Sequence, residues 1–234
     1  MKLYDFVHFL RFRHKFKKES VSQLGQDLWV LYRTKGLQNK FFVDVGACYP
    51  INLSNSYLLE KSGFKGLLIE PQPKLVSQLR KNRISPVIEC AIHRSENLIE
   101  LEIAQEPEFT THSNNNKKHR LFRTTENRIV VKSFTLTEIC KRNNVPKFFT
   151  YLSLDIEGNE LGALQSLDFS RYSPLMISVE HNFSKEKSSI DDFMKSKGYI
   201  KDYLGFNSKW DAFYIKKQFL YEAIKTTRSN FRIH

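Results

Sequence analysis

The sequence has no long apolar run and few cysteines, and each absence excludes a class of protein. Among its 234 residues, no segment approaches the roughly 18 consecutive apolar residues that a membrane-spanning helix needs. The N-terminus places its apolar residues before its basic ones, the reverse of a secretory signal, so we expect a cytoplasmic protein. The three cysteines are odd in number and lack CxxC spacing, which argues against both a disulfide framework and a zinc site.

Glycine is scarce in the turn that follows the first predicted strand. In FFVDVGACYP at 41–50, Gly46 is followed by no second or third glycine, and Pro50 has no N–H group to donate. The dinucleotide fingerprint needs those glycines to bring a pyrophosphate close to the backbone, so an NAD-dependent dehydrogenase is disfavoured. S-adenosylmethionine is a nucleoside with a sulfonium group and no phosphate, and it fits this turn better.

A second apolar run, GLLIEPQP at 66–73, ends on Glu70, 26 positions after Asp44. Doubly wound α/β proteins hold a nucleoside between a strand that ends in a glycine turn and a strand that ends on an acidic residue. The Glu70 carboxylate can accept both ribose hydroxyl protons. The alternative is that Asp44 and Glu70 only cap the ends of two strands.

The formal net charge of +12 suggests a nucleic-acid-binding protein until the basic residues are located. Residues 1–18 carry six Lys and Arg against Asp5, and residues 216–234 carry five against Glu222. The middle of the chain is therefore nearly neutral. Because an enzyme that tracks phosphates is expected to have basic residues beside its cleft, we expect no nucleic-acid partner.

Strand and helix patterns alternate along most of the chain. Strands are predicted near 40–45, 65–70, 86–91, 149–155 and 174–180, and helices near 55–62, 73–82, 135–143, 158–167 and 185–197. The segments 199–207 and 210–217 indicate a closing antiparallel hairpin. The predicted fold class is α/β, a Rossmann-like seven-stranded methyltransferase sheet, parallel apart from that hairpin, with helices on both faces. Residues 97–103 and 128–133 also suggest strands, and the polar segment 104–127 between them suggests a lid or substrate loop.

The two ends of the chain differ from its middle. We divide the chain into a basic amphipathic extension at 1–21, a methyltransferase domain at 22–216 and a basic tail at 217–234. Apolar residues within 3–10 have helical spacing, and RFRHKFKK follows at 11–18. This combination suits an anionic membrane surface at the inner face of the membrane, a partner such as a glycosyltransferase, or an ordinary helix packed on the domain.

Further acidic residues lie at the ends of two later strands. LSLDIEGNE at 152–160 places Asp155 and Glu157 where a strand gives way to a helix, and MISVEHN at 176–182 places Glu180 and His181 at the end of the next strand. Ligands bind beyond the carboxyl ends of the strands in an open parallel sheet. We therefore expect these side chains to face the same crevice as the glycine turn.

From about Ser22 to about Ile215 the chain resembles the FkbM family of S-adenosylmethionine-dependent methyltransferases. The resemblance rests on six segments taken together and in order: Ser22–Asp27, Phe42–Ala47, Ser54–Tyr57, Glu70–Pro71, Leu154–Gly158 and Glu180–Asn182. The family often has a glycine where this chain has Pro50. The resemblance implies O-methylation, commonly of a sugar hydroxyl or a polyketide hydroxyl.

The resemblance also implies where the nucleoside lies. Gly46 and Ala47 should approach the methionine end of S-adenosylmethionine, and Glu70 should hold the ribose. Ala91 lies at the strand end that usually meets adenine.

The polar end of the cofactor is expected to have four protein contacts. By the same resemblance, Ser54 and Asn55 contact its carboxylate, and Asp44 and Asp155 bind its cationic amino group. For Ser54 and Asn55 the alternative is N-capping of a helix, which their residue types also favour.

Methyl transfer from a sulfonium is an in-line displacement, so the enzyme must align the acceptor oxygen and remove its proton. His181 is the preferred general base because the ordinary pKa of histidine lies nearest neutrality, and Glu157 or Asp155 can orient or replace it. A metal-assisted mechanism is the alternative, in which Asp155, Glu180 and His181 supply three ligands to Mg²⁺ or Mn²⁺.

The sequence thus predicts an S-adenosylmethionine-dependent O-methyltransferase that acts on a hydroxyl of a glycan, a glycolipid or another sugar-containing acceptor. The alternatives are a methyltransferase of a polyketide or lipid hydroxyl or of an amine, and a nucleotide-binding α/β protein that transfers no methyl group. Against methylation of base amines, residues 155–158 read Asp-Ile-Glu-Gly and not the Asn/Asp-Pro-Pro-aromatic turn that the resemblance associates with that reaction.

Overall fold

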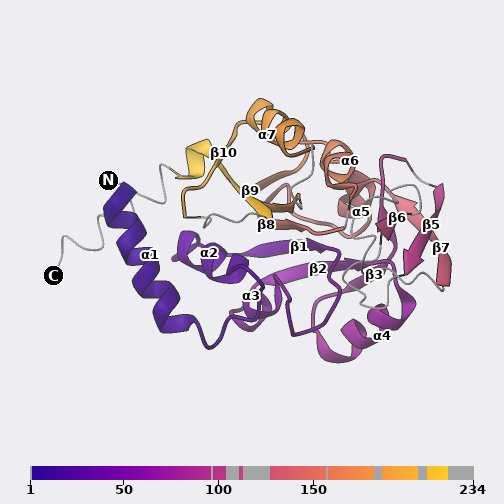
Figure 1. Cartoon of the computed structure of the whole chain (residues 1–234), viewed down its shortest axis with the longest axis horizontal. Helices are drawn as coiled ribbons and strands as arrows, with labels where there is room; N and C mark the ends of the chain where they lie inside the picture. Colours follow the sequence, from indigo (N-terminus) through magenta and orange to yellow (C-terminus); the bar gives the residue numbers. More distant parts are fainter. Residues whose placement is uncertain are drawn as a thin grey trace.

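A computed structural model describes residues 2–95, 97–103, 111–112, 127–156, 158–181, 186–204 and 210–220. The described strands include a seven-stranded sheet in the order β10-β11-β9-β8-β1-β2-β3 (Figure 1). Its members are β1 (Phe41–Val45), β2 (Lys65–Glu70), β3 (Val87–Glu89), β8 (Phe148–Leu154), β9 (Ser173–Glu180), β10 (Tyr199–Lys201) and β11 (Asp211–Lys216). Strand β11 is antiparallel to β9 and β10, and the other pairs are parallel. The predicted methyltransferase sheet and its closing hairpin are confirmed.

Helices cover both faces of this sheet (Figure 1). On one face lie α1 (Lys2–Phe16), α2 (Gln26–Arg33), α3 (Tyr57–Lys61) and α4 (Pro73–Asn82), and on the other α5 (Leu136–Arg142), α6 (Glu160–Gln165) and α7 (Glu186–Ser196). Strand β1 shows why both faces need cover, because Phe42 packs in the core beneath α2 and α3 while Val43 packs in the core beneath α5 and α6. No helix in the described ranges combines the length and the apolar character that crossing a membrane requires.

Local sequence explains where several helices begin. Pro73 stands in the first turn of α4, where its missing N–H costs nothing. Thr135 caps α5 by accepting a hydrogen bond from the backbone N–H of Glu138, in the order typical of a capping box.

A smaller sheet, in the order β4-β7-β5-β6, lies at one end of the molecule (Figure 1). It consists of β4 (Ala91–Ile92), β5 (Asn97–Ile103), β6 (Thr111–His112) and β7 (Asn127–Phe134). The strand predicted near 86–91 is thus two strands: β3 pairs with β2 in the main sheet, and after Cys90 the chain leaves that sheet and pairs with β7. The expected lid at 104–127 lies outside the described residues apart from β6 and the first residue of β7.

The strand order places a crevice at β1. From β1 the chain proceeds outward through β2 and β3, and it then returns to the other side of β1 with β8 and β9. The loops that follow β1 and β8 therefore leave the sheet in opposite directions, which is where open α/β sheets bind their ligands.

Candidate active site

The turn after β1 requires a glycine for two reasons. Gly46 has φ of 82°, a left-handed conformation that other residues adopt only with strain. A Cβ atom at this position would also lie 1.8 Å from the carbonyl oxygen of Asp155. Since the backbone N–H of Asp155 donates to the Val45 carbonyl at 3.0 Å, the glycine allows the ends of β1 and β8 to stay in contact.

The N–H groups of this turn are already used within the protein. Gly46 and Ala47 donate to the Ile69 carbonyl at 3.0 and 3.1 Å, and Cys48 donates to Glu70 Oε2 at 3.0 Å. The turn therefore joins β1 to the end of β2. A phosphate that approached it would find these three donors engaged, in contrast to the open donors of a dinucleotide-binding loop.

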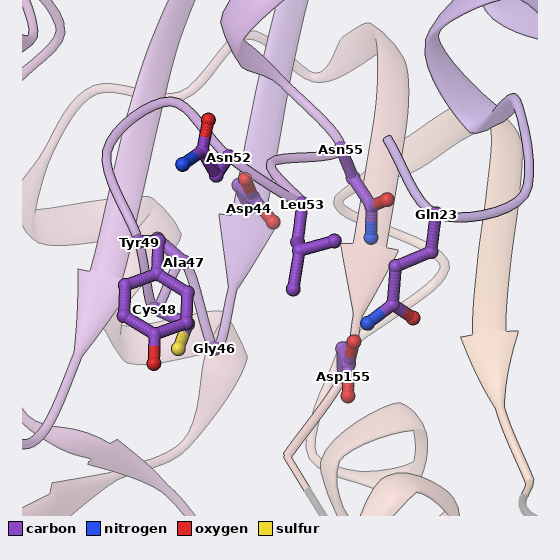
Figure 2. Close-up of a pocket in the computed structure, with 10 residues that line it drawn as sticks. All are labelled: Gln23, Asp44, Gly46, Ala47, Cys48, Tyr49, Asn52, Leu53, Asn55 and Asp155. Carbon is purple, nitrogen blue, oxygen red and sulfur yellow. The ribbon is translucent and has the colours of Figure 1, made fainter. Parts of the chain in front are cut away.

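A pocket opens between the ends of β1 and β8 (Figure 2). Its empty space, counted out to the solvent at its mouth, is about 340 Å³. The side chains of Gln23, Asn55 and Asp155 lie on one side and those of Cys48 and Tyr49 on the other, with Leu53 between them. The lining residues are Gln23, Asp44, Gly46, Ala47, Cys48, Tyr49, Asn52, Leu53, Asn55 and Asp155.

The Asp44 carboxylate is held at the pocket by a buried chain of polar contacts. Ser56 Oγ donates to Asp44 Oδ2 at 2.5 Å, and Arg83 Nη2 donates to Ser56 Oγ at 3.0 Å. The same guanidinium donates from Nε to Glu60 Oε1 at 3.0 Å. Burial raises the pKa of Asp44, and the Ser56 hydrogen bond and the Arg83 charge act in the opposite direction.

Arg83 also fixes the loop that forms one wall of the pocket. It contacts the Pro50 carbonyl at 3.3 Å and Ser54 Oγ at 3.2 Å. Because this loop holds Cys48 and Leu53 at φ of 49° and 62°, both in the left-handed region, it needs such contacts to keep its shape.

Ser54 and Asn55 have different surroundings. Ser54 Oγ accepts from the backbone N–H of Tyr57 at 3.2 Å, at the start of α3, and it does not line the pocket. Asn55 does line the pocket, and its Nδ2 donates to Ser153 Oγ at 3.1 Å. Asn55 Oδ1 is buried and accepts no hydrogen bond from any described residue. An amide oxygen in this position is available to a ligand donor.

Glu70 stands behind the turn and not on the pocket wall. Its Oε2 accepts from Cys48 N, its Oε1 accepts from Gln72 N at 3.0 Å, and the side chain is buried. Burial, together with the nearby Asp44 carboxylate, raises the pKa of Glu70 to about 7. Each carboxylate oxygen keeps a second lone pair, so the ribose contact stays a prediction alongside this structural role.

On the β8 side, Asp155 belongs to a cluster of carboxyl groups. It shares a hydrogen bond with Glu180, and burial together with the Glu180 charge raises the pKa of Asp155 well above its ordinary value. Glu180 pairs across the strands with Asp211, which accepts a hydrogen bond from Gln26 Nε2 at 2.8 Å. Burial raises the pKa of Asp211 to about 6.

His181 is buried away from the pocket, and the expected metal ligands do not form a metal site. His181 is 1% exposed, its backbone N–H donates to the Trp210 carbonyl at 2.7 Å, and it does not line the pocket. Within the described ranges, no group of three or more His, Cys, Asp or Glu side chains is arranged to hold a metal ion. The expected Mg²⁺ or Mn²⁺ site at Asp155, Glu180 and His181 is therefore not supported, and Glu157 lies outside the described residues.

Ala91 was expected to meet adenine, and that contact stays a prediction. Ala91 opens β4 in the smaller sheet, where it packs with Ile99 and Leu101, and it is not among the pocket residues. The chain leaves the main sheet at Cys90, so the last residue of β3 in that sheet is Glu89.

Two residues of the site were not among the site residues expected from the sequence. Arg83 follows α4 as one basic residue among several, and only the fold shows that it reaches Ser56 and Glu60. Gln23 reaches the pocket because the segment before α2 pairs with the pocket loop through a bridge between Ser22 and Leu53.

The side chains that line this pocket suit a cationic nucleoside better than a phosphate. Asp44 and Asp155 line it, and none of its ten lining residues is Lys or Arg. Buried carboxyl groups with raised pKa values and no cation on the pocket wall favour a ligand that brings positive charge. The sulfonium and amino groups of S-adenosylmethionine meet this requirement, and a pyrophosphate does not.

Comparison with known proteins agrees with this geometry. A family model described as the methyltransferase FkbM domain matches residues 44–201, more than half of the chain. Among curated proteins, no significant match was found.

Two solved methyltransferase structures are distantly similar. The METTL16 methyltransferase domain has 11% identity and a TM-score of 0.42, over 80% of this chain and 63% of that one, so this chain matches less than two thirds of its length. Precorrin-6y C5,15-methyltransferase from Geobacter metallireducens has 10% identity and a TM-score of 0.38, over 80% of this chain and 85% of that one.

Proposed function

The chain belongs to the FkbM methyltransferase family, and on that premise we propose that it transfers the methyl group of S-adenosylmethionine to a hydroxyl of a glycan or another sugar-containing acceptor. The observation that carries the proposal is the acidic pocket at the junction of β1 and β8, which has no basic lining residue. Family membership implies that S-adenosylmethionine is the methyl donor. Our proposal adds that the acceptor is a hydroxyl oxygen.

The residues of the pocket have distinct proposed tasks toward the donor. Asp44 and Asp155 face the pocket from β1 and from the end of β8, so together they can hold a cationic amino group between them. The unpaired Oδ1 of Asn55 is an additional acceptor for the same group. Glu70 is the proposed acceptor for the ribose hydroxyls, since each of its carboxylate oxygens keeps a second lone pair.

When bound, the donor supplies an electrophilic methyl group: the acceptor oxygen forms a bond to that carbon while the carbon–sulfur bond breaks and its electron pair stays on sulfur. The protein must take the proton of the acceptor hydroxyl. Asp155 is the proposed base because it lines the pocket and the raised pKa of its carboxyl makes it a stronger base than an exposed aspartate. Glu180, hydrogen-bonded to Asp155, can share the proton, and a role for His181 stays a prediction.

A sugar acceptor is supported by the polar side chains at the mouth of the pocket. Gln23 and Asn52 are exposed there, and primary amides both donate to and accept from hydroxyl groups. The near-neutral middle of the chain also offers little attraction to a polyanionic acceptor.

Calorimetry with S-adenosylhomocysteine, NAD and ATP tests the donor site. We expect S-adenosylhomocysteine to bind and the two phosphorylated nucleotides not to bind. Binding of NAD without binding of S-adenosylhomocysteine would overturn the proposal. Incubation of candidate glycans with an isotopically labelled methyl donor, followed by mass spectrometry, then tests the acceptor.

The Asp155→Asn substitution tests the base. It removes the proton acceptor and keeps the shape of the side chain, so we expect kcat to fall about 10²- to 10⁴-fold. Thr137→Val on α5, which does not line the pocket, is a control for general loss of stability. Turnover by Asp155→Asn at the wild-type rate would remove Asp155 from the mechanism.

A further inference from the structure

Helix α1 exposes an apolar stripe on the side that faces away from the domain. Leu3, Val7 and Leu10 follow one another at helical spacing and are 74%, 38% and 38% exposed, and Tyr4 beside them is 47% exposed. Exposed apolar residues are ordinary when single, but a row of them on one helix marks a contact surface. The helix forms the end of the molecule opposite the smaller sheet (Figure 1).

The inner side of α1 is firmly fixed to the domain. Arg33 donates from Nη1 to Asp5 Oδ2 at 2.7 Å and from Nε to Asp202 Oδ2 at 2.6 Å, and all three side chains are buried. The centroids of the Phe9 and Tyr32 rings lie 5.2 Å apart. With its inner side held in this way, α1 cannot turn to bury the outer stripe without breaking a buried ion-pair network.

Basic residues flank the stripe. Arg11, Lys15, Lys17 and Lys18 follow on α1 and its C-terminal turn, and all are exposed. On a helical projection Arg11, Lys15 and Lys18 fall to one side of the stripe and Lys17 to the other. Glu19 is the one acidic side chain exposed on residues 3–20, so the outer face carries a clear excess of positive charge.

We infer that the outer face of α1 docks on a membrane surface that contains anionic lipids. An apolar row with basic residues on both sides is the arrangement by which helices lie in the plane of a bilayer, with the apolar side chains among the acyl chains and the cations at the headgroups. A soluble acidic protein would match the charge but would not need the apolar row. Because the segment after α1 continues to Gln23 at the pocket, docking through α1 would tether the enzyme to the membrane.

The test is co-sedimentation of the whole chain with phosphatidylcholine vesicles, with and without one-quarter phosphatidylglycerol. We expect binding only to the vesicles that contain phosphatidylglycerol, and we expect that binding to weaken as salt is added. The triple substitution Leu3→Ser, Val7→Ser, Leu10→Ser should lower the vesicle affinity at least tenfold. The matched control is Leu98→Ser with Val130→Ser, which removes exposed apolar side chains (68% and 66% exposed) from the smaller sheet and should bind as wild type.

A second pair of variants isolates the charge. Arg11→Glu with Lys18→Glu should weaken binding about 25-fold or more, because each basic residue near an anionic surface contributes about fivefold in affinity. Lys74→Glu with Lys81→Glu, two exposed lysines of α4, changes the net charge equally and should have a smaller effect. Circular dichroism confirms that each variant folds.

The proposal is overturned if the wild-type chain stays in the supernatant with both kinds of vesicle, or if the α1 variants bind as well as their controls. No methyl donor is needed in these experiments, so their failure is distinguishable from failure of the proposed enzymatic function.

Discussion

The substitution Gly46→Ala tests the junction on which the whole site depends. Gly46 has a left-handed backbone, and a Cβ atom there would lie 1.8 Å from the Asp155 carbonyl oxygen, whereas real Cβ contacts essentially never fall below 3.0 Å. The ends of β1 and β8 would have to separate by more than 1 Å. Gly63, with φ of 84° and no atom within 4 Å of an added Cβ, offers a matched control for the backbone conformation alone.

The expected loss of stability has two contributions. The left-handed conformation costs an alanine about 1 kcal/mol at either position. At Gly46, separation of β1 from β8 would also break the hydrogen bond from Asp155 to Val45, and the shift of the turn would stretch those from Gly46 and Ala47 to Ile69; all three lie at 3.0 to 3.1 Å and contribute roughly 1 kcal/mol each. We therefore expect Gly63→Ala to lower the free energy of unfolding by about 1 kcal/mol and Gly46→Ala to lower it by up to about 4 kcal/mol.

Urea denaturation measures the stability, and calorimetry with S-adenosylhomocysteine measures the site. We expect Gly63→Ala to bind the ligand as wild type does, and Gly46→Ala to bind it at least tenfold more weakly even under conditions where it is folded. Equal stability and equal affinity in the two variants would refute the claim that the glycine is required by contact between β1 and β8.

Three further predictions concern the groups around the turn. The raised pKa of about 7 means that folded wild-type protein binds the Glu70 proton more tightly than the unfolded chain, so its free energy of unfolding falls as the pH rises from about 5 to about 7. In Glu70→Gln this fall should be smaller by up to about 3 kcal/mol. Parallel pH profiles of the two proteins would contradict this. Arg83→Leu should lower the free energy of unfolding by about 3 kcal/mol or more, because it leaves the buried Glu60 without its cation, and Arg80→Leu, an exposed pair with Glu89, should cost less than about 1 kcal/mol. Iodoacetamide should modify Cys48, which is partly exposed, and spare the buried Cys90 and Cys140; S-adenosylhomocysteine should slow the modification, as followed by peptide mass spectrometry, and unchanged kinetics would place the ligand elsewhere.

The main sheet could be predicted from the sequence because its strands are buried on both faces. The strands that the patterns place near 40–45, 65–70, 149–155 and 174–180 correspond to β1, β2, β8 and β9. Such runs are almost wholly apolar and end at a glycine or an acidic residue, so both their existence and their boundaries are visible.

The smaller sheet could be predicted only in part. The strands suggested at 97–103 and 128–133 are confirmed as β5 and β7. Strand β4 has only two residues, and it continues directly from the apolar run of β3 with Cys90 between them. The apolar pattern predicts one strand across 86–91. The chain leaves the main sheet within this run because β4 pairs with β7, about 40 residues further along the chain, and a local pattern does not show such a pairing. The adenine contact expected at Ala91 stays a prediction.

The candidate site was predicted in part, and the limit is set by side-chain contacts across the fold. Asp44, Gly46, Ala47, Asn55 and Asp155 do line one pocket, because strand ends in a parallel sheet meet at one edge. Ser54 and Glu70 bind backbone N–H groups and do not line that pocket, and their contacts with the cofactor stay predictions. Spacing along the chain cannot distinguish a side chain that faces a pocket from one that supports it.

The glycine turn has a different task here from the one that its sequence first suggests. In dinucleotide-binding proteins the turn offers backbone N–H groups to a pyrophosphate, but here those of Gly46, Ala47 and Cys48 are bound to Ile69 and Glu70. Discrimination between ligands must therefore come from side chains and charge. A pocket lined by two aspartates without a basic residue repels phosphates and attracts cations, so the absence of the later glycines and the acidity of the pocket are two consequences of the same ligand preference.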